Sequence, residues 1–175
     1  MAFKKPLSVG DIIETNGYMG FVKDIQLRAT VIETFQGLHV IIPNRLVFQN
    51  ALTNYTKTYR RRVDLSVGVS YGDNLERVKE IAREAVLKNE YLTSEKDVNV
   101  VFEEFGDSSI NFRVMFWINY SPQDPNYLQA RSSAVMEIKK AFDANDITIP
   151  FPIRTLDFGI KGGEKLNGHL KELQA

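Results

Sequence analysis

The 175-residue chain contains no cysteine and only two histidines. The first absence excludes disulfides, thiolate nucleophiles and thiolate metal sites, and it fits a reducing compartment. His39 and His169 lie far apart in the sequence, so they do not indicate a shared metal site. We therefore expect neither a metal centre nor another cofactor.

Recognised catalytic motifs are missing as well. The sequence holds no G-x-S-x-G, H-E-x-x-H, P-loop or dinucleotide-binding fingerprint. Glu103 and Glu104 are adjacent carboxylates, but strand alternation would place them on opposite faces of a sheet, where they could not share one acid/base site. These absences predict that the protein is not an enzyme.

Long apolar runs are also absent. No stretch reaches the roughly 18 apolar residues that span a bilayer, and no charged-then-apolar signal peptide opens the chain. We therefore expect the polypeptide as given to fold in water.

The chain has no net charge, because 22 lysines and arginines balance 22 aspartates and glutamates. The charge is nevertheless unevenly distributed. Residues 1–62 contain nine basic and four acidic residues, so this part carries +5 and the remainder carries −5. The asymmetry predicts two modules in different surroundings, the first of them facing something anionic such as phosphate or a membrane surface.

Residues 7–58 have the pattern of a small all-β structure. The expected strands are 12–14, 18–25, 29–34, 39–42 and 51–56. Five strands in about fifty residues favour a small closed barrel in the style of the Sm or oligonucleotide-binding folds. Such a small barrel buries little surface, so we expect it to rely on a partner or on copies of itself.

Turn signals separate these strands. Asn16 and Gly17 predict a tight hairpin because both accept positive φ, and Gly20 is expected to mark a bulge or bend. Pro43 ends the fourth strand because it has no N–H for a ladder, and Asn44 is expected on a turn. No helix is predicted in this module.

Residues 59–152 combine strand and helix periodicities. The expected order is strand 62–70, helix 73–89, strand 98–102, strand 110–118, helix 124–144 and strand 147–150. Asp73 is expected to cap the first helix, and Asp124 with Pro125 to begin the second, which would bury Leu128 and Val135. This order is the ferredoxin-like pattern of an α+β domain, with both helices on one sheet face.

The opposite sheet face is expected to be bare. Alternation assigns Val101, Arg113, Met115 and Trp117 to it. This mixture is too apolar to be left in water, so we expect it to be an interface with a neighbouring domain or subunit.

The chain is expected to leave the sheet at Pro150, Phe151 and Pro152, because this run excludes regular strand pairing. Residues 153–160 alternate again and predict an exit strand that needs partners. A tail follows from Lys161, where Gly162 and Gly163 indicate mobility.

Several short motifs occur in a recognisable order. They are V-G-D at 9–11, glycines 17 and 20, L-R-A-T at 27–30, I-P-N at 42–44, R-R-x-D-L-S-V-G-V-S-Y at 61–71, S-S-I-N-F at 108–112 and I-P-F-P at 149–152. Together they cover nearly the whole chain, and they resemble the cytoplasmic part of the mechanosensitive channel of small conductance (MscS-like) family.

The resemblance implies a homoheptameric channel of the cytoplasmic (inner) membrane, opened by bilayer tension on osmotic downshock to release ions and small solutes. In that arrangement an Sm-like β domain, residues 1–58, lies under the membrane beside lipid headgroups. A ferredoxin-like α+β domain, residues 59–152, hangs below it, with lateral portals near the junction. Residues 153–175 carry a strand that joins a small β-barrel at the base, followed by the tail.

The resemblance also assigns residues. Pro43, Asn44 and Arg45 form the family motif and are expected to contact a neighbouring subunit, and Pro150, Phe151 and Pro152 are expected to enter the basal barrel. The pore-lining helix should precede Phe3 and is not part of this sequence, so we expect this chain alone to form vestibule and to conduct nothing.

A nucleic-acid-binding protein with the same two domains is the alternative. Tyr55 and Tyr59 lie beside Arg60, Arg61 and Arg62, and aromatic rings next to cations can bind single strands. These residues cluster at the end of the first module, whereas a stacking platform needs aromatics spread over a sheet face. We therefore expect no nucleic acid as a partner.

Overall fold

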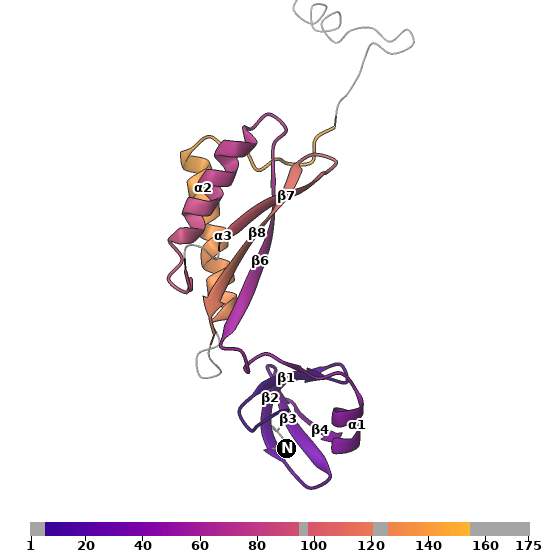
Figure 1. The fold of residues 1–175 in the computed structure, drawn as a ribbon. Coiled ribbons are helices and arrows are strands. Elements are labelled where there is room, and N and C mark those ends of the chain that lie inside the picture. Colours follow the sequence, from indigo (N-terminus) through magenta and orange to yellow (C-terminus); the bar gives the residue numbers. More distant parts are fainter. Residues whose placement is uncertain (1–5, 95–97, 121–125, 155–175) are drawn as a thin grey trace, which may run out of the picture.

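The computed structural model describes residues 6–94, 98–120 and 126–154. Within these residues the chain forms two antiparallel sheets and three helices, each sheet with its own hydrophobic core (Figure 1). The mixed α+β class is therefore confirmed. We call β1–β5 with α1 the β module, and β6–β8 with α2 and α3 the α/β module.

The β module is a five-stranded sheet in the order β4-β3-β2-β1-β5. Its elements are β1 (Ile12–Thr15), β2 (Tyr18–Ile25), β3 (Ala29–Thr34), β4 (His39–Pro43), α1 (Asn44–Gln49) and β5 (Thr53–Asn54). The β1–β2 hairpin turns at Asn16 and Gly17, with φ of 51° and 78°, as the sequence predicts. Its core contains Leu7, Ile13, Val22, Ile32, Ile42 and Val47.

Two expectations for the β module are wrong. Residues 44–49 form the helix α1, which buries Val47 against the sheet and is too short to show a helical period in the sequence. The bulge lies between Val22 and Asp24, whereas Gly20 pairs in regular register. A Cβ on Gly20 would lie 2.1 Å from the Glu33 backbone oxygen, so glycine is needed here for a close approach of strands.

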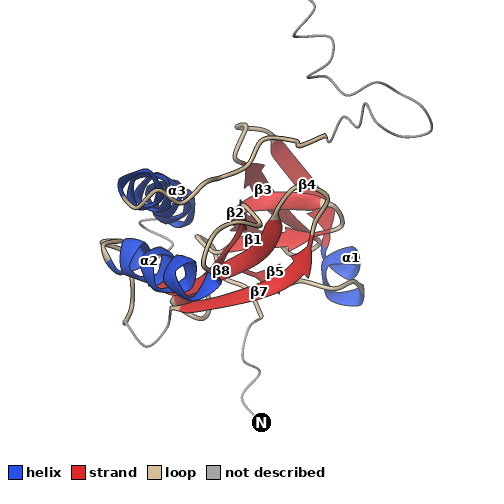
Figure 2. Cartoon of the chain, turned by 90° about the horizontal axis from the view of Figure 1, so that it is seen from above, coloured by secondary structure: helices blue, strands red, loops and turns tan. Residues whose placement is uncertain are grey.

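The α/β module is a three-stranded sheet in the order β6-β8-β7, with β6 at Arg60–Val69, β7 at Asn99–Phe105 and β8 at Ile110–Asn119. Helices α2 (Leu75–Leu87) and α3 (Tyr127–Ala144) lie side by side on one face of this sheet (Figures 1 and 2). The predicted alternation of β8 is confirmed, since Ile110, Phe112, Val114, Phe116 and Ile118 are all buried beneath the helices.

The capping prediction for the first helix is wrong in detail. Asn74 caps α2 and accepts a hydrogen bond from the Arg77 N–H, whereas Asp73 accepts one from the Thr148 N–H at 3.1 Å. Helix α3 begins after Asn126, and the predicted start at Asp124 and Pro125 lies outside the described residues.

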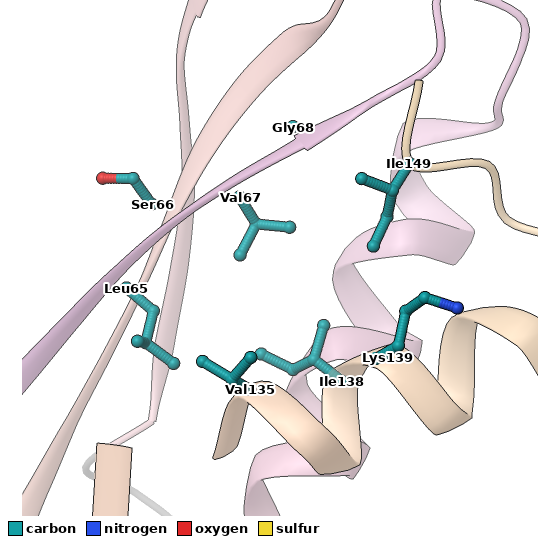
Figure 3. A pocket seen from close by; sticks show the side chains of 8 residues that line it. All are labelled: Leu65, Ser66, Val67, Gly68, Val135, Ile138, Lys139 and Ile149. Atoms are coloured by element: carbon teal, nitrogen blue, oxygen red, sulfur yellow. The ribbon is translucent and has the colours of Figure 1, made fainter. Parts of the chain in front are cut away.

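The fourth strand predicted at 147–150 is not formed. One backbone hydrogen bond, from Ser70 N–H to the Thr148 oxygen at 3.0 Å, links this segment to the end of β6. The outer edge of β6 therefore opens on a cavity of about 310 Å³. Figure 3 shows Val135, Ile138 and Ile149 around it, with Ser66 directed away.

This open edge explains why the predicted burial of Val135 is wrong. Val135 is 53% exposed and Leu128 is 71% exposed, whereas Ala130, Ala134, Ile138 and Phe142 form the buried stripe of α3. These four residues recur every four positions and so share one face of α3, whereas Leu128 and Val135 lie at the margins of that face.

Candidate functional site

Asn44 ties three parts of the β module together. Its side-chain amide donates hydrogen bonds to the backbone oxygens of Gln26 and Leu27, at 2.9 and 3.2 Å. Its side-chain oxygen accepts one from the hydroxyl of the buried Thr30 at 2.8 Å. The Asn44 N–H donates to the Arg28 oxygen at 2.9 Å. The residue therefore holds the β2–β3 connection against the start of α1.

Replacing Asn44 by alanine should lower the free energy of unfolding of the β module by about 1–3 kcal/mol, because Thr30 and two backbone oxygens lose their partner. Hydrogen exchange of the Ala29 and Thr30 amides measures the effect. The control is Arg45→Ala, which removes an exposed side chain and should change stability by no more than about 0.5 kcal/mol. Equal protection in both variants would contradict the anchoring role.

Pro43 and Arg45 flank this anchor with exposed side chains, whereas Asn44 is half-buried. Pro43 pairs with Ala29 at the end of β4, and β4 is an edge of the sheet. The motif thus combines an internal anchor with two side chains that are free to meet another surface. A role of Pro43, Asn44 and Arg45 in subunit contact stays a prediction.

The four residues predicted for the bare sheet face do lie together. Val101 pairs with Arg113 across β7 and β8, Asp64 pairs with Met115, and Arg62 pairs with Trp117. All lie on the face opposite α2 and α3, where Val101 is 42% and Trp117 36% exposed. We call Val101, Arg113, Met115 and Trp117 the open sheet face.

Charge on the open sheet face is largely neutralised by local pairs. Arg113 contacts Glu103 at 3.0 and 3.1 Å, and Arg62 contacts Asp64 at 2.7 and 2.9 Å, both in two-point geometry. The Arg60 guanidinium lies 5.1 Å from the centre of the Trp117 ring. The surface is therefore mixed apolar and paired-ionic rather than basic.

The expectation that Glu103 and Glu104 face opposite ways is wrong. A bulge between Phe102 and Glu104 breaks the alternation of β7. Glu103 then reaches Arg113, and Glu104 accepts a hydrogen bond from Asn111 at 3.0 Å. Both carboxylates are exposed and occupied by these partners.

Phe151 and Pro152 are exposed, and Pro150 is half-buried, beyond the end of the α/β module. Phe151 is 86% and Ile153 60% exposed, and the Ile153 N–H donates to the Ser108 hydroxyl oxygen at 3.0 Å. Residues 153 and 154 belong to no strand, and the rest of the predicted exit strand lies outside the described residues. Entry into a basal barrel stays a prediction.

The junction between the modules contains a cluster of which the sequence pattern indicates only Tyr55 and Arg61. The Arg61 guanidinium lies over the rings of Tyr127, Tyr55 and Tyr120, at 3.9, 4.7 and 5.5 Å from their centres. Tyr55 comes from the β module, whereas Tyr120 and Tyr127 come from the α/β module. Periodicity could not reveal this cluster because its members belong to distant segments.

Tyr55 connects the cluster to β1 by donating a hydrogen bond to the Glu14 carboxylate at 2.5 Å. This hydrogen bond, followed by burial and the negative charge of Glu14, raises the pKa of Tyr55, and the Arg61 charge opposes the shift. The protonated phenol is thus the form that the folded protein favours.

The raised pKa predicts a loss of stability at alkaline pH. An unfolded tyrosine titrates near pH 10, so the contribution of Tyr55 is complete below that value and disappears as the pH rises through the higher folded pKa. The free energy of unfolding should therefore fall more steeply above about pH 10 in the wild type than in Tyr55→Phe. Urea titrations at several pH values measure this, and parallel curves would exclude the effect.

None of the helices within residues 6–94, 98–120 and 126–154 has the length and apolar character needed to cross a bilayer. The described part of the chain also contains no group of three or more histidine, aspartate or glutamate side chains placed to hold a metal ion.

Two family models match consecutive parts of the chain. The model described as "Mechanosensitive ion channel, beta-domain" matches residues 1–57, and "Mechanosensitive ion channel MscS, C-terminal" matches residues 63–149. Both fall on the modules described above, in the same order.

Individual proteins agree with these models. An uncharacterized MscS family protein of Archaeoglobus fulgidus is 32% identical over 98% of this chain, and the small-conductance mechanosensitive channel MscMJ of Methanocaldococcus jannaschii is 34% identical over 87%. The chain spans 59% and 43% of the length of these two relatives.

The fold also matches a solved channel structure. The crystal structure of Helicobacter pylori MscS in a closed state superposes with a TM-score of 0.80 at 32% identity, covering 90% of this chain and 60% of that one. Because two family models match both modules and the similarity to these relatives extends over most of the chain, the chain belongs to the MscS family of mechanosensitive ion channels.

Proposed function

We propose that this chain is the vestibule-forming part of a tension-gated channel that releases ions and small solutes on osmotic downshock. The observation that carries the proposal is the match to H. pylori MscS over 90% of the chain, both modules included. The role is structural and conductive rather than enzymatic. The whole channel lies in the cytoplasmic membrane, with this segment on the cytoplasmic side.

Within that channel, residues 1–58 act as an Sm-like β domain and residues 59–152 as a ferredoxin-like domain. The family models support this division, because their matches end at 57 and begin at 63. The net charge of +5 on residues 1–62 favours a position of the β module beside anionic lipid headgroups. This attraction acts only over about 8 Å at physiological salt, so the module must lie close to the bilayer.

Self-assembly, as a homoheptamer, accounts for the apolar surfaces that each chain leaves exposed. The open sheet face presents Val101 and Trp117 to solvent, and Phe151 and Ile153 extend beyond the α/β module. Residues 150–152 lead into a strand at 153–160 that joins a basal barrel, followed by the tail to 175. Pro43 and Arg45 contact the neighbouring β module.

Light scattering tests assembly directly. The chain should form a ring-sized species, and deletion of residues 150–175 should reduce its mass, since the deletion removes the barrel strand. The cut preserves Ile147, which is buried, and Thr148, which binds Ser70 and Asp73, so the α/β module keeps these contacts. An unchanged mass after deletion would refute the role of the exit strand.

Channel function is tested by replacing the matching segment of the H. pylori channel with this chain. Membrane patches containing the chimera should show currents activated by suction, and cells should survive osmotic downshock. A chimera carrying Phe112→Ala, which disrupts the α/β core, is the matched negative control. A chimera that reaches the membrane at the native level without any suction-activated current would overturn the proposal.

The nucleic-acid alternative gains no support from the geometry. Arg61 is enclosed by three tyrosine rings, Arg62 is paired with Asp64, and Arg60 lies over Trp117. The three arginines therefore engage different partners within the chain and do not form one continuous basic groove, which binding of a single strand requires. Retention of the chain on single-stranded nucleic acid at physiological salt would reopen this alternative.

A further inference from the structure

A cavity of about 380 Å³, open on one side, lies at the junction of the two modules. Its described lining is Met19, Phe35, Arg61, Tyr120, Tyr127, Leu128 and Gln129. Phe35 and Leu128 are 55% and 71% exposed, so large apolar side chains border open space. The volume lies in the range of small-molecule sites, which are mostly apolar with a few placed polar groups.

Arg61 supplies the charge in this cavity. Within the described residues its guanidinium forms no ion pair and donates no hydrogen bond, and its contacts are the three tyrosine rings. Cation–π contacts engage the charge of a guanidinium and do not use its five N–H donors, which lie in the plane of the group. Those donors have the geometry that binds a carboxylate or phosphate at two points.

Among the described residues around the cavity, no carboxylate pairs with Arg61. The described lining of the cavity contains no acidic side chain. The carboxylate of Glu14 contacts the Tyr55 hydroxyl instead. The neighbouring Arg62 differs from Arg61 in this respect, because Asp64 binds it at two points.

The start of α3 adds to the positive potential. Tyr127, Leu128 and Gln129 form its first turn and also line the cavity. Asn126 makes no side-chain capping hydrogen bond within the described residues. The amide groups at the start of this 18-residue helix carry a partial positive charge that favours an anion.

We propose that the junction cavity binds a small amphipathic anion, with a phosphate or carboxylate group on Arg61 and a short alkyl body against Phe35 and Leu128. The apolar walls exclude a bare inorganic ion as the preferred ligand, because the alkyl body contributes its own burial. This site does not depend on channel assembly and is present in the single chain.

The probe is hexyl phosphate, titrated into the full chain by isothermal calorimetry. Inorganic phosphate and hexanol, which each carry only one half of the probe, are titrated as controls. Hexyl phosphate should bind saturably, and each control should bind at least about tenfold more weakly. Arg61→Gln should weaken hexyl phosphate binding about tenfold or more. Arg62→Gln changes the net charge equally and should leave binding unchanged.

Arg61→Gln also removes a contact between the two modules and could therefore change the structure. A second pair of variants tests the cavity while leaving Arg61 in place. Leu128→Glu places a carboxylate at the rim and should abolish binding by repulsion. Val135→Glu, on the same helix but outside the cavity, should bind as the wild type does. Leu128 and Val135 are both exposed, so both variants should unfold at about the same temperature as the wild type.

The source of the anion is resolved with phosphatidylcholine vesicles that contain phosphatidic acid. Vesicle binding that requires Arg61 would assign the headgroup to a lipid, whereas hexyl phosphate binding without vesicle binding would assign a soluble ligand. Absence of saturable binding to both probes, or equal binding by wild type and Leu128→Glu, would overturn the proposal.

Discussion

Replacing Phe112 by alanine will lower the free energy of unfolding of the α/β module by about 3–5 kcal/mol. Phe112 is fully buried on β8, and its ring lies 5.3 Å from that of Phe102 and 6.4 Å from that of Phe142 on α3. Its removal leaves a cavity between sheet and helix that close packing cannot fill. A loss of this size is comparable to the whole stability of a small domain.

The single tryptophan makes the measurement specific. Trp117 lies on the same strand as Phe112 but on the open sheet face, so its fluorescence follows unfolding of the α/β module in urea. Phe112→Leu keeps most of the volume and should cost about 1.5 kcal/mol or less. Phe151→Ala removes a ring that is 86% exposed and should cost no more than about 0.5 kcal/mol. Similar losses in all three variants would contradict the assignment of the core.

Gly20→Ala will destabilise the β module by about 3 kcal/mol, at the upper end of the usual cost of overpacking. The new Cβ would lie 2.1 Å from the Glu33 oxygen and 2.8 Å from the Thr34 Cα. Both obstacles are backbone atoms of β3, so no rotamer change relieves them, and β2 must separate from β3. Native-state hydrogen exchange of the β2 and β3 amides should accelerate accordingly.

Gly72→Ala is the matched control for this substitution. Its Cβ would meet only the Ser70 hydroxyl oxygen, at 3.8 Å, and its φ is not in the left-handed region. The change should leave stability unaltered or raise it by up to about 1 kcal/mol, because alanine restricts the unfolded chain. Unchanged exchange in Gly20→Ala would show that β2 and β3 tolerate a wider spacing.

Local patterns predicted the parts of this fold that depend on neighbouring residues. Asn16 and Gly17 form the expected hairpin because they accept positive φ, and that preference belongs to the residues themselves. Likewise, one face of β8 is apolar at every second residue, and that face is buried. The open sheet face follows from the same alternation, which is why its four members were identified together.

The same patterns failed where distant segments decide the outcome. Val135 has the expected spacing on α3 but is exposed, because residues 147–150 do not complete the sheet beside β6. The in–out alternation of β7 is broken at Glu103 and Glu104, because β7 has one extra residue between its pairs with Phe112 and Asn111 of β8. Asn44 was expected on a turn, but its side chain donates hydrogen bonds to the connection between β2 and β3.

The sequence by itself therefore determined most of the strands, the two long helices, the absence of cysteine chemistry and the family, because these depend on residue type and near-neighbour spacing. Only the tertiary structure decided which groups meet at the junction. Arg61 could pair with a carboxylate, water or aromatic rings. Its enclosure by Tyr55, Tyr120 and Tyr127 arises because the two modules bring distant segments to one place.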